Sequence, residues 1–302
     1  MGCIQSCFSS ANQATPTGQR SCRALRCCGS MPIEPERRYR VTGCTYLHNG
    51  YLVIVDHNNK RIKLYTPELK CCSFIVLEYR PFGICADGNS IYVTMPKKKM
   101  IQRLKVTIPM PFVSRKLLEG SFFPTEAECR GIASYNGDLI VSLKYSTHAN
   151  TEITDTAWQI QIVSTKGTVK RRIIHDQSGL ALVQDARFIC LTADKKELVI
   201  SEGEDNRVKC LNIETGELTF NQHLEDPKGV VCDDEGNIYV LGKHGAIRWI
   251  LYDRSVVKSL LQGTPSVNFS DAIAYWKNSN ALAVPRNENK IDFYRLQKSM
   301  FD

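Results

Sequence analysis

The stretch GVVCDDEGNIYV (229–240) consists of an apolar segment, an acidic turn that ends at Gly236, and a second apolar segment. Two short apolar segments joined by a Gly-containing turn predict a β-hairpin. A turn followed by a short apolar strand recurs six times along the chain. The turns begin at Asn49, Asp87, Asn136, Asp194, Glu235 and Asn278, with successive spacings of 38, 49, 58, 41 and 43 residues. A repeat of this length that contains only strands predicts a β-propeller.

The strand pattern predicts an all-β fold with six blades of four antiparallel strands each. The expected blades cover residues 41–79, 80–120, 129–175, 185–222, 226–262 and 270–298, with the outer strand of the second blade near 112–119. The last blade holds only three strands, so we expect residues 33–40 to complete it and close the ring. An open ring is the alternative, because Pro32 and Pro35 weaken that segment as a strand. The predicted domains are therefore a flexible tail (1–32) and a propeller (33–302).

A second repeated motif lies between the second and third strands of three blades. It reads VDHNNKRIKLY (55–65), SEGEDNRVKCL (201–211) and VPRNENKIDFY (284–294), and each copy places turn-forming residues before a basic residue. These basic residues are Arg61, Arg207 and Lys290. A tight turn explains the Asn and Asp residues, since both side chains bond their own backbone. The basic residue is then expected to stabilise neighbouring loops, with contact to a ligand as the alternative.

Together the two motifs resemble the NHL repeat, most closely in GVVCDDEGNIYV (229–240) and VTGCTYLHNGYLVIVDHNNKRIKLY (41–65). The chain is similar to the six-bladed propellers at the carboxyl end of tripartite-motif proteins, over residues 39–296. Those proteins carry zinc-bound RING and B-box modules before the propeller. The tail here has no His before His48, so it lacks the ligands of a RING. The resemblance implies a binding module that recognises a protein or an RNA.

Composition favours one reduced, globular body. Apolar residues make up 43% of the chain, and no apolar run is long enough to span a bilayer. Four of the 13 cysteines (Cys85, Cys190, Cys210 and Cys232) fall within apolar strand patterns, where a free thiol acts as a small hydrophobic side chain. No secretory signal is evident, so we expect a cytoplasmic protein.

The first residues, Met1-Gly2-Cys3-Ile4-Gln5-Ser6, fit the rule for N-myristoylation at Gly2. Cys3 and Cys7 are candidates for a second acyl group, and a second anchor is required because a single myristoyl chain binds a membrane weakly. The tail is also basic, with Arg20, Arg23 and Arg26 preceding any acidic residue. We therefore expect attachment to the inner face of a membrane. An unmodified flexible tail and a zinc-binding cysteine cluster are the alternatives.

Two basic clusters are candidate partner sites: Lys97, Lys98 and Lys99 in a turn, and Lys170, Arg171 and Arg172 in an outer strand. A basic patch could bind RNA, whereas a solvated loop and a charged sheet edge are the structural alternatives. The net charge of +8 is divided evenly between residues 1–40 and the rest, so the body itself is close to neutral. This favours a protein partner over RNA, and no DNA binding is expected.

No catalytic motif was found. The sequence contains no G-x-S-x-G, no H-E-x-x-H and no Gly-rich phosphate loop. We therefore expect neither an enzyme nor a cofactor. A metal-dependent hydrolase like the lactonases built on six-bladed propellers remains a third alternative, although its ligands cannot be placed in this chain.

Overall fold

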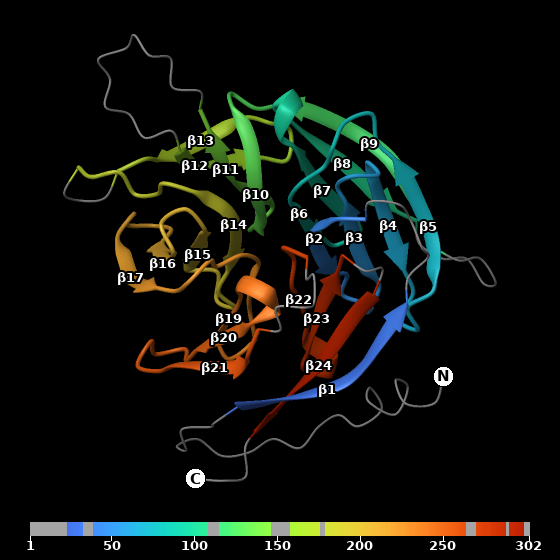
Figure 1. Cartoon of the computed structure of the whole chain (residues 1–302). Coiled ribbons are helices and arrows are strands. Elements are labelled where there is room, and N and C mark those ends of the chain that lie inside the picture. Colours follow the sequence, from blue (N-terminus) through green and yellow to red (C-terminus); the bar gives the residue numbers. More distant parts are fainter. Residues whose placement is uncertain are drawn as a thin grey trace.

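The computed structural model describes residues 23–32, 39–107, 115–145, 158–175, 179–263, 270–287 and 290–298. Side chains are not described for β1 or for Lys298. Within these ranges the chain forms six sheets of four antiparallel strands, arranged around one axis (Figure 1). The prediction of a six-bladed, all-β propeller is confirmed. Short 3-10 turns are the only helical elements in the described residues, at Pro96–Lys98, Lys243–Gly245 and Lys277–Ser279.

Blades 1 to 5 each run from an innermost to an outermost strand in chain order. Blade 1 contains β2 (Val41–Tyr46), β3 (Leu52–Asp56), β4 (Arg61–Tyr65) and β5 (Cys71–Val76). Blade 2 contains β6 (Ile84–Asp87), β7 (Ser90–Met95), β8 (Met100–Val106) and β9 (Leu117–Pro124). Blade 3 contains β10 (Glu128–Tyr135), β11 (Asp138–Lys144), β12 (Trp158–Ser164) and β13 (Val169–Ile173).

The second half of the ring repeats this order. Blade 4 contains β14 (Ala186–Leu191), β15 (Glu197–Glu202), β16 (Arg207–Asn212) and β17 (Leu218–His223). Blade 5 contains β18 (Val230–Cys232), β19 (Ile238–Leu241), β20 (Ile247–Ile250) and β21 (Val257–Leu261). Blade 6 contains β22 (Ala274–Trp276), β23 (Ala281–Arg286) and β24 (Lys290–Lys298), and its outer strand is β1 (Arg23–Pro32).

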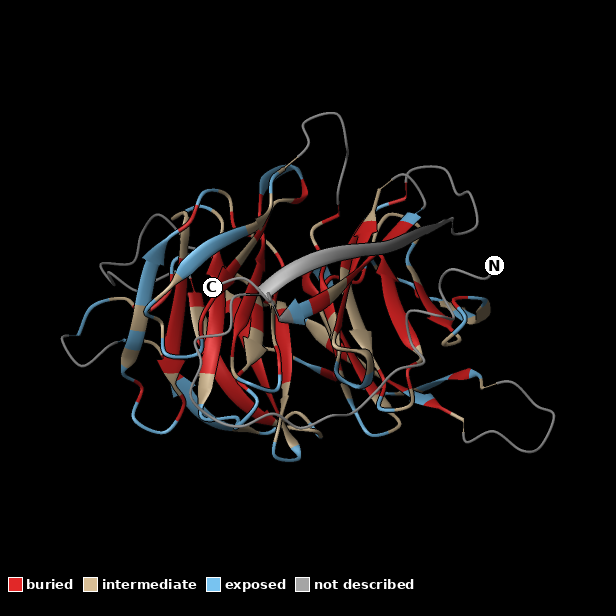
Figure 2. Ribbon diagram, turned by 90° about the horizontal axis from the view of Figure 1, so that it is seen from below, coloured by how far each residue is buried: buried red, intermediate tan, exposed pale blue. Residues whose placement is uncertain are grey.

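The predicted hairpin turns have the backbone geometry that their sequences favour. At Asn136-Gly137 the two φ angles are 48° and 82°, as in the tight turn that matches strand twist. Apolar side chains of the second and third strands fill the spaces between neighbouring blades. One such core joins Val53 and Leu64 of blade 1 to Val93 and Leu104 of blade 2. Figure 2 shows the buried residues concentrated in these inner strands and the exposed ones in loops and outer strands.

The ring closes as expected, but through a different segment. The strand that pairs with β24 is β1, in antiparallel register from Arg23↔Lys298 to Pro32↔Lys290 (Figure 1). The prediction that residues 33–40 form this strand is therefore wrong, and the predicted tail (1–32) contains the closing strand. Of residues 33–40, only Tyr39 and Arg40 lie within the described residues, and they directly precede β2. Pro32 is the last residue of β1, and an outermost strand tolerates proline.

The outer strand of blade 2 also differs from the prediction. It is β9, at Leu117–Pro124, whereas the expected position was 112–119. Phe123 explains the shift, because its buried side chain packs between blades 2 and 3 with Val163. Both ends of β9 reach a core, since Leu117 is buried between blades 1 and 2 and Phe123 between blades 2 and 3.

Candidate binding face at the channel mouth

The innermost strands give each blade one pair of residues that lines the central channel. The pairs are Gly43-Cys44, Gly83-Ile84, Gly131-Ile132, Phe188-Ile189, Gly229-Val230 and Ala272-Ile273. The first member is small in five blades because the strands approach closely there. A Cβ on Gly83 would lie 2.3 Å from the carbonyl oxygen of Arg130, and one on Gly229 would lie 2.7 Å from that of Asp271. In blade 5 this glycine, Gly229, is the first residue of the motif GVVCDDEGNIYV (229–240).

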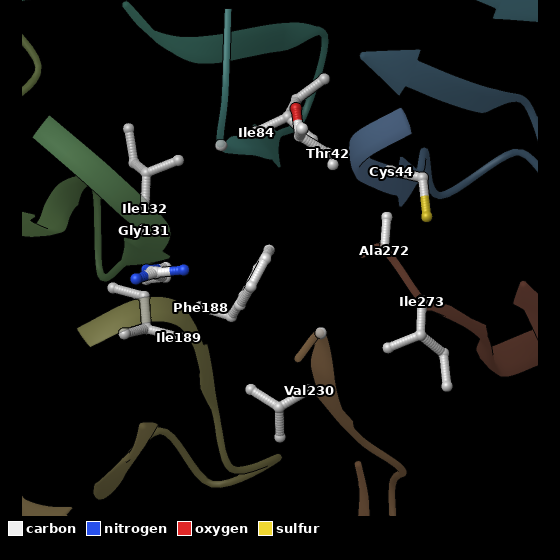
Figure 3. Close-up of a pocket in the computed structure, with 14 residues that line it drawn as sticks. Thr42, Cys44, Ile84, Gly131, Ile132, Phe188, Ile189, Val230, Ala272 and Ile273 are labelled. Carbon is white, nitrogen blue, oxygen red and sulfur yellow. The ribbon is translucent and has the colours of Figure 1, made fainter. Parts of the chain in front are cut away.

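Blade 4 departs from the pattern with Phe188. Figure 3 shows its ring projecting into the space around which the other pairs are arranged. The cavity that remains has a volume of about 60 Å³, enough for only a few water molecules. Phe188 also contacts Phe82 across the channel, with ring centroids 5.5 Å apart. The two rings therefore form an apolar floor that closes the channel.

A wider hollow of about 270 Å³ lies above this floor. It forms where the chain enters the innermost strands, and it is lined by Arg40, Phe82, Arg187, Phe188, Gly203, Asp226, Pro227, Lys228 and Asp271. We call this hollow the channel mouth. In four of the six blades, the residue just before the channel pair lines this hollow: Phe82, Arg187, Lys228 and Asp271.

Three cations at the mouth each contact a carboxylate that is less exposed than they are. Arg40 Nη2 and Lys228 Nζ lie 2.9 and 3.1 Å from the carboxylate of Asp271. The side chains of the two cations are 48% and 29% exposed, whereas that of Asp271 is 18% exposed. Arg187 Nε lies 2.7 Å from Asp185 Oδ1, and the Asp185 side chain is fully buried. Arg187 Nη2 also lies 2.6 Å from Glu204 Oε1, whose side chain is 60% exposed. Arg40 and Lys228 therefore lie above a less exposed acceptor, whereas Arg187 lies between a buried carboxylate and an exposed one.

Buried polar groups hold Asp185 in place beneath Arg187. Glu202 Oε1 accepts the backbone N–H of Gln184 at 2.7 Å, and Lys209 Nζ lies 2.6 Å from Glu202 Oε2. Asp185 itself accepts the backbone N–H of Glu204 at 3.1 Å. Burial raises the pKa of Asp185, while the Arg187 guanidinium lowers it. A buried pair in blade 4 thus positions the loop that leads into β14, the strand that carries Arg187.

His57 lies beside these cations. Its Nδ1 is 2.7 Å from the carbonyl oxygen of Pro81, so Nδ1 donates a hydrogen bond there. Burial lowers the pKa of His57, and the positive charges of Arg40, Arg80 and Arg130 lower it further. Arg130 in turn lies over the ring of Phe82, 5.2 Å from the ring centroid. The charge state of His57 therefore responds to the positive potential on this side of the disc.

The basic residues of the turn motif serve the local structure. Arg61 lies over the ring of Phe74, 5.1 Å from its centroid, and Arg207 donates to Asn221 at 3.0 Å and pairs with Asp205. Both stand at the start of a third strand, as does Lys290 in blade 6. None of the three lines the mouth.

The two predicted basic clusters do not converge. On β13, Lys170 pairs with Asp138 at 2.7 Å, Arg171 donates to the carbonyl oxygen of Ile213 at 2.6 Å, and Arg172 pairs with Glu126. In the other cluster, Lys98 lies over the ring of Tyr79, and Lys99 adopts a left-handed conformation that ends a 3-10 turn. Lys97 approaches the mouth, since it pairs with Glu128, which also binds Arg130. Gly2, Cys3 and Cys7 lie outside the described residues.

Sequence reasoning missed the residues of the mouth. Arg187, Lys228 and Asp271 are far apart in the chain, and none belongs to a charged run. A signal was nevertheless present, because each directly precedes the residue that occupies the repeated glycine position. In the ring this position brings together residues from different blades, and four of the six line the mouth.

A second hollow, of about 250 Å³, lies where the chain leaves the innermost strands of blades 4 and 5. We call it the opposite hollow, and its lining consists of Thr192, Ala193, Asp194, Glu197, Asp234, Glu235, Gly236, Tyr252 and Arg254. The backbone N–H of Lys196 and the hydroxyl of Thr192 lower the pKa of Asp194, which favours its charged form. The cation that lines this hollow, Arg254, is more buried than Asp194 and lies 2.8 Å from Glu197.

The described residues contain no group of three or more His, Cys, Asp or Glu side chains placed to hold a metal ion. They also contain no helix with the length and apolarity needed to cross a bilayer.

Comparisons with known proteins define the fold but no family. No protein-family model matches the chain, and no curated protein matches its sequence. Among solved structures, a streptogramin B lyase has 13% identity and a TM-score of 0.57, covering 91% of this chain and 98% of the other. A luciferin-regenerating enzyme has 16% identity and a TM-score of 0.58, with 90% and 96% covered. A glutaminyl cyclase from Myxococcus xanthus has 11% identity and a TM-score of 0.54, with 93% and 100% covered.

These similarities confirm the propeller over nearly the whole chain. At such low identity they carry the fold alone, because one fold supports many unrelated functions. The resemblance to NHL repeats and to tripartite-motif proteins stays a prediction.

Proposed function

We propose that this protein is a non-catalytic binding propeller that recognises a protein partner through the channel mouth. The observation that carries the proposal is the arrangement of exposed Arg40, Arg187 and Lys228 over less exposed Asp271 and Asp185. Outward guanidinium and ammonium groups suit a carboxylate-bearing partner, because charge-assisted hydrogen bonds to carboxylates are strong and directional. We therefore expect the partner to present an acidic segment.

The size of the mouth supports a protein partner. Sites for whole small molecules usually have about 300–1,000 Å³. The mouth has about 270 Å³ and an apolar floor formed by Phe82 and Phe188. It therefore suits one or two inserted side chains, while the surrounding loops contact the rest of the partner.

The experiment is affinity capture from cell extract with three forms of the full chain. The mouth variant is Arg40→Gln/Lys228→Gln, and the control is Lys170→Gln/Arg172→Gln, which removes the same charge from β13. Wild type and control should enrich the same protein. The mouth variant should enrich at least about 10-fold less of it, since a hydrogen bond to a charged group contributes about 1.5–3 kcal/mol. Equal capture by all three forms, or no enriched protein, would contradict the proposal.

RNA binding is a second candidate, favoured by Lys97. Its side chain is 83% exposed and it contacts Glu128, so it lies near the mouth. RNA binding should weaken steeply with salt and be lost in Lys97→Glu/Lys98→Glu/Lys99→Glu. Crosslinked RNA recovered with the wild type, but with no protein partner, would favour this candidate over the first.

We also propose that acylation at Gly2, with Cys3 and Cys7 as further acceptors, holds the propeller at a membrane. The support is the sequence of the first residues. These residues precede β1, which begins at Arg23, so the closing strand does not include them. Gly2→Ala should move the full chain from the membrane fraction to the soluble fraction, because myristate requires that glycine. A wild-type chain that is already soluble would contradict this proposal.

A further inference from the structure

Two cysteines from different blades meet at the interface of blades 4 and 5. Cys190 Sγ lies 3.5 Å from Cys232 Sγ, although the residues are 42 positions apart in the chain. Cys190 belongs to β14 and Cys232 to β18, the innermost strands of the two blades. Disulfide sulfurs are about 2.0 Å apart, so a small rotation of the two side chains would bring these thiols to bonding distance.

Both cysteines lie near one of the hollows. Each residue is partly buried, whereas Cys85, Cys129 and Cys210 are buried. The opposite hollow begins two residues beyond each of them, at Thr192 and Asp234. A small oxidant that enters this hollow is therefore close to the pair.

We propose that Cys190 and Cys232 form a disulfide under oxidising conditions, which fastens blade 4 to blade 5. With hydrogen peroxide as the oxidant, one thiolate attacks a peroxide oxygen, becomes a sulfenic acid and releases the other oxygen as water. The second thiol then attacks that sulfur, the S–S bond forms, and a second water leaves. The chain loses two protons and two electrons in all, and the peroxide is reduced to two waters.

The environment of the two cysteines determines the rate of this reaction. The hydrogen bond with Cys190 and burial raise the pKa of Cys232 well above its usual value. The thiolate is the reactive form, so oxidation is expected to be slow compared with that of a catalytic redox cysteine. The pair therefore responds to sustained oxidising conditions rather than to brief ones.

The experiment treats the reduced full chain with hydrogen peroxide, alkylates the remaining thiols and maps the peptides without reduction. A peptide pair joining Cys190 to Cys232 should appear, lighter by about 2 Da than the two free peptides, and dithiothreitol should abolish it. Oxidation should also raise the melting temperature by about 5 °C, because the cross-link restricts the unfolded chain.

Variants separate this pair from the other cysteines. Cys190→Ser and Cys232→Ser should each lose the cross-linked peptide and the rise in melting temperature. Cys210→Ser, from the same interface core, should keep both. The proposal is overturned if oxidised wild type lacks the Cys190–Cys232 peptide, joins either residue to another cysteine, or carries only added oxygen there. Because the wild-type peptide map decides the question, a variant that fails to fold does not obscure it.

Discussion

The two hollows at opposite ends of the innermost strands differ in the depth at which their lining cations lie. At the mouth, Arg40 and Lys228 are 48% and 29% exposed above Asp271, which is 18% exposed. In the opposite hollow, Arg254 is 15% exposed and pairs with Glu197, whereas Asp234 is 43% exposed and pairs with Lys277. The volumes of the two hollows are similar, at about 270 and 250 Å³. The cations that line the mouth therefore lie nearer to solvent than the cation that lines the opposite hollow.

The largest effect is expected beneath the mouth, at Lys209. Lys209→Ala leaves the buried Glu202 carboxylate without its cation, and loss of one partner of a buried pair lowers the free energy of unfolding by about 3–5 kcal/mol. Urea denaturation measures this change. The double variant Lys209→Met/Glu202→Gln removes both charges and should lose much less. A loss below about 1 kcal/mol for Lys209→Ala would show that the loop before β14 does not depend on this pair.

The next largest change in stability is expected at the five small residues that line the channel. Gly83→Ala places a Cβ 2.3 Å from the carbonyl oxygen of Arg130, so blades 2 and 3 must move apart. We expect the free energy of unfolding to fall by about 2 kcal/mol, as for an overpacked core. Gly203→Ala is the matched control, since Gly203 lines the mouth but the new Cβ meets nothing closer than 3.5 Å. Equal losses in the two variants would contradict the proposed tight ring.

A comparison of two arginines tests whether the depth of a cation decides its contribution to stability. Arg254→Gln removes a cation that is 15% exposed and paired with Glu197, so a loss of about 1.5 kcal/mol is expected. Arg40→Gln removes a cation that is 48% exposed and paired with Asp271, which also contacts solvent, and a solvated pair contributes about 0–1 kcal/mol. Denaturation of both variants in parallel gives the order. If Arg40→Gln were the more destabilising change, this mouth cation would be a structural group rather than a group available to a partner.

The smallest effect concerns pH. Because the folded state lowers the pKa of His57, the unfolded chain binds a proton there first as pH falls. The contribution of His57 to stability is therefore full above the unfolded pKa, near 6.5, and declines below it. Wild type should lose more stability than His57→Gln between about pH 7.5 and 5 in urea denaturation. A larger loss in His57→Gln would reverse the sign and exclude this group as the cause.

Much of the fold follows from sequence because its units are local. Hairpins such as Asn136-Gly137 join strands that neighbour each other in the chain, so turn chemistry and apolar alternation indicate them directly. The candidate site could not be found in this way. A charged run such as Lys170–Arg172 is easily recognised in a sequence, yet its side chains pair with nearby residues. A single residue such as Lys228 is not recognised in this way, although it lines the mouth.

The sequence by itself determined the number of blades, their order and the repeated glycine that lets them approach the axis. Only the tertiary structure decided that β1, rather than residues 33–40, closes the ring. It also decided that Phe188 fills the channel, and that Arg40 and Lys228 share Asp271. The physical reason is the range of the interactions. A hairpin is specified by adjacent residues, whereas ring closure and the mouth bring together residues that are separated by whole blades.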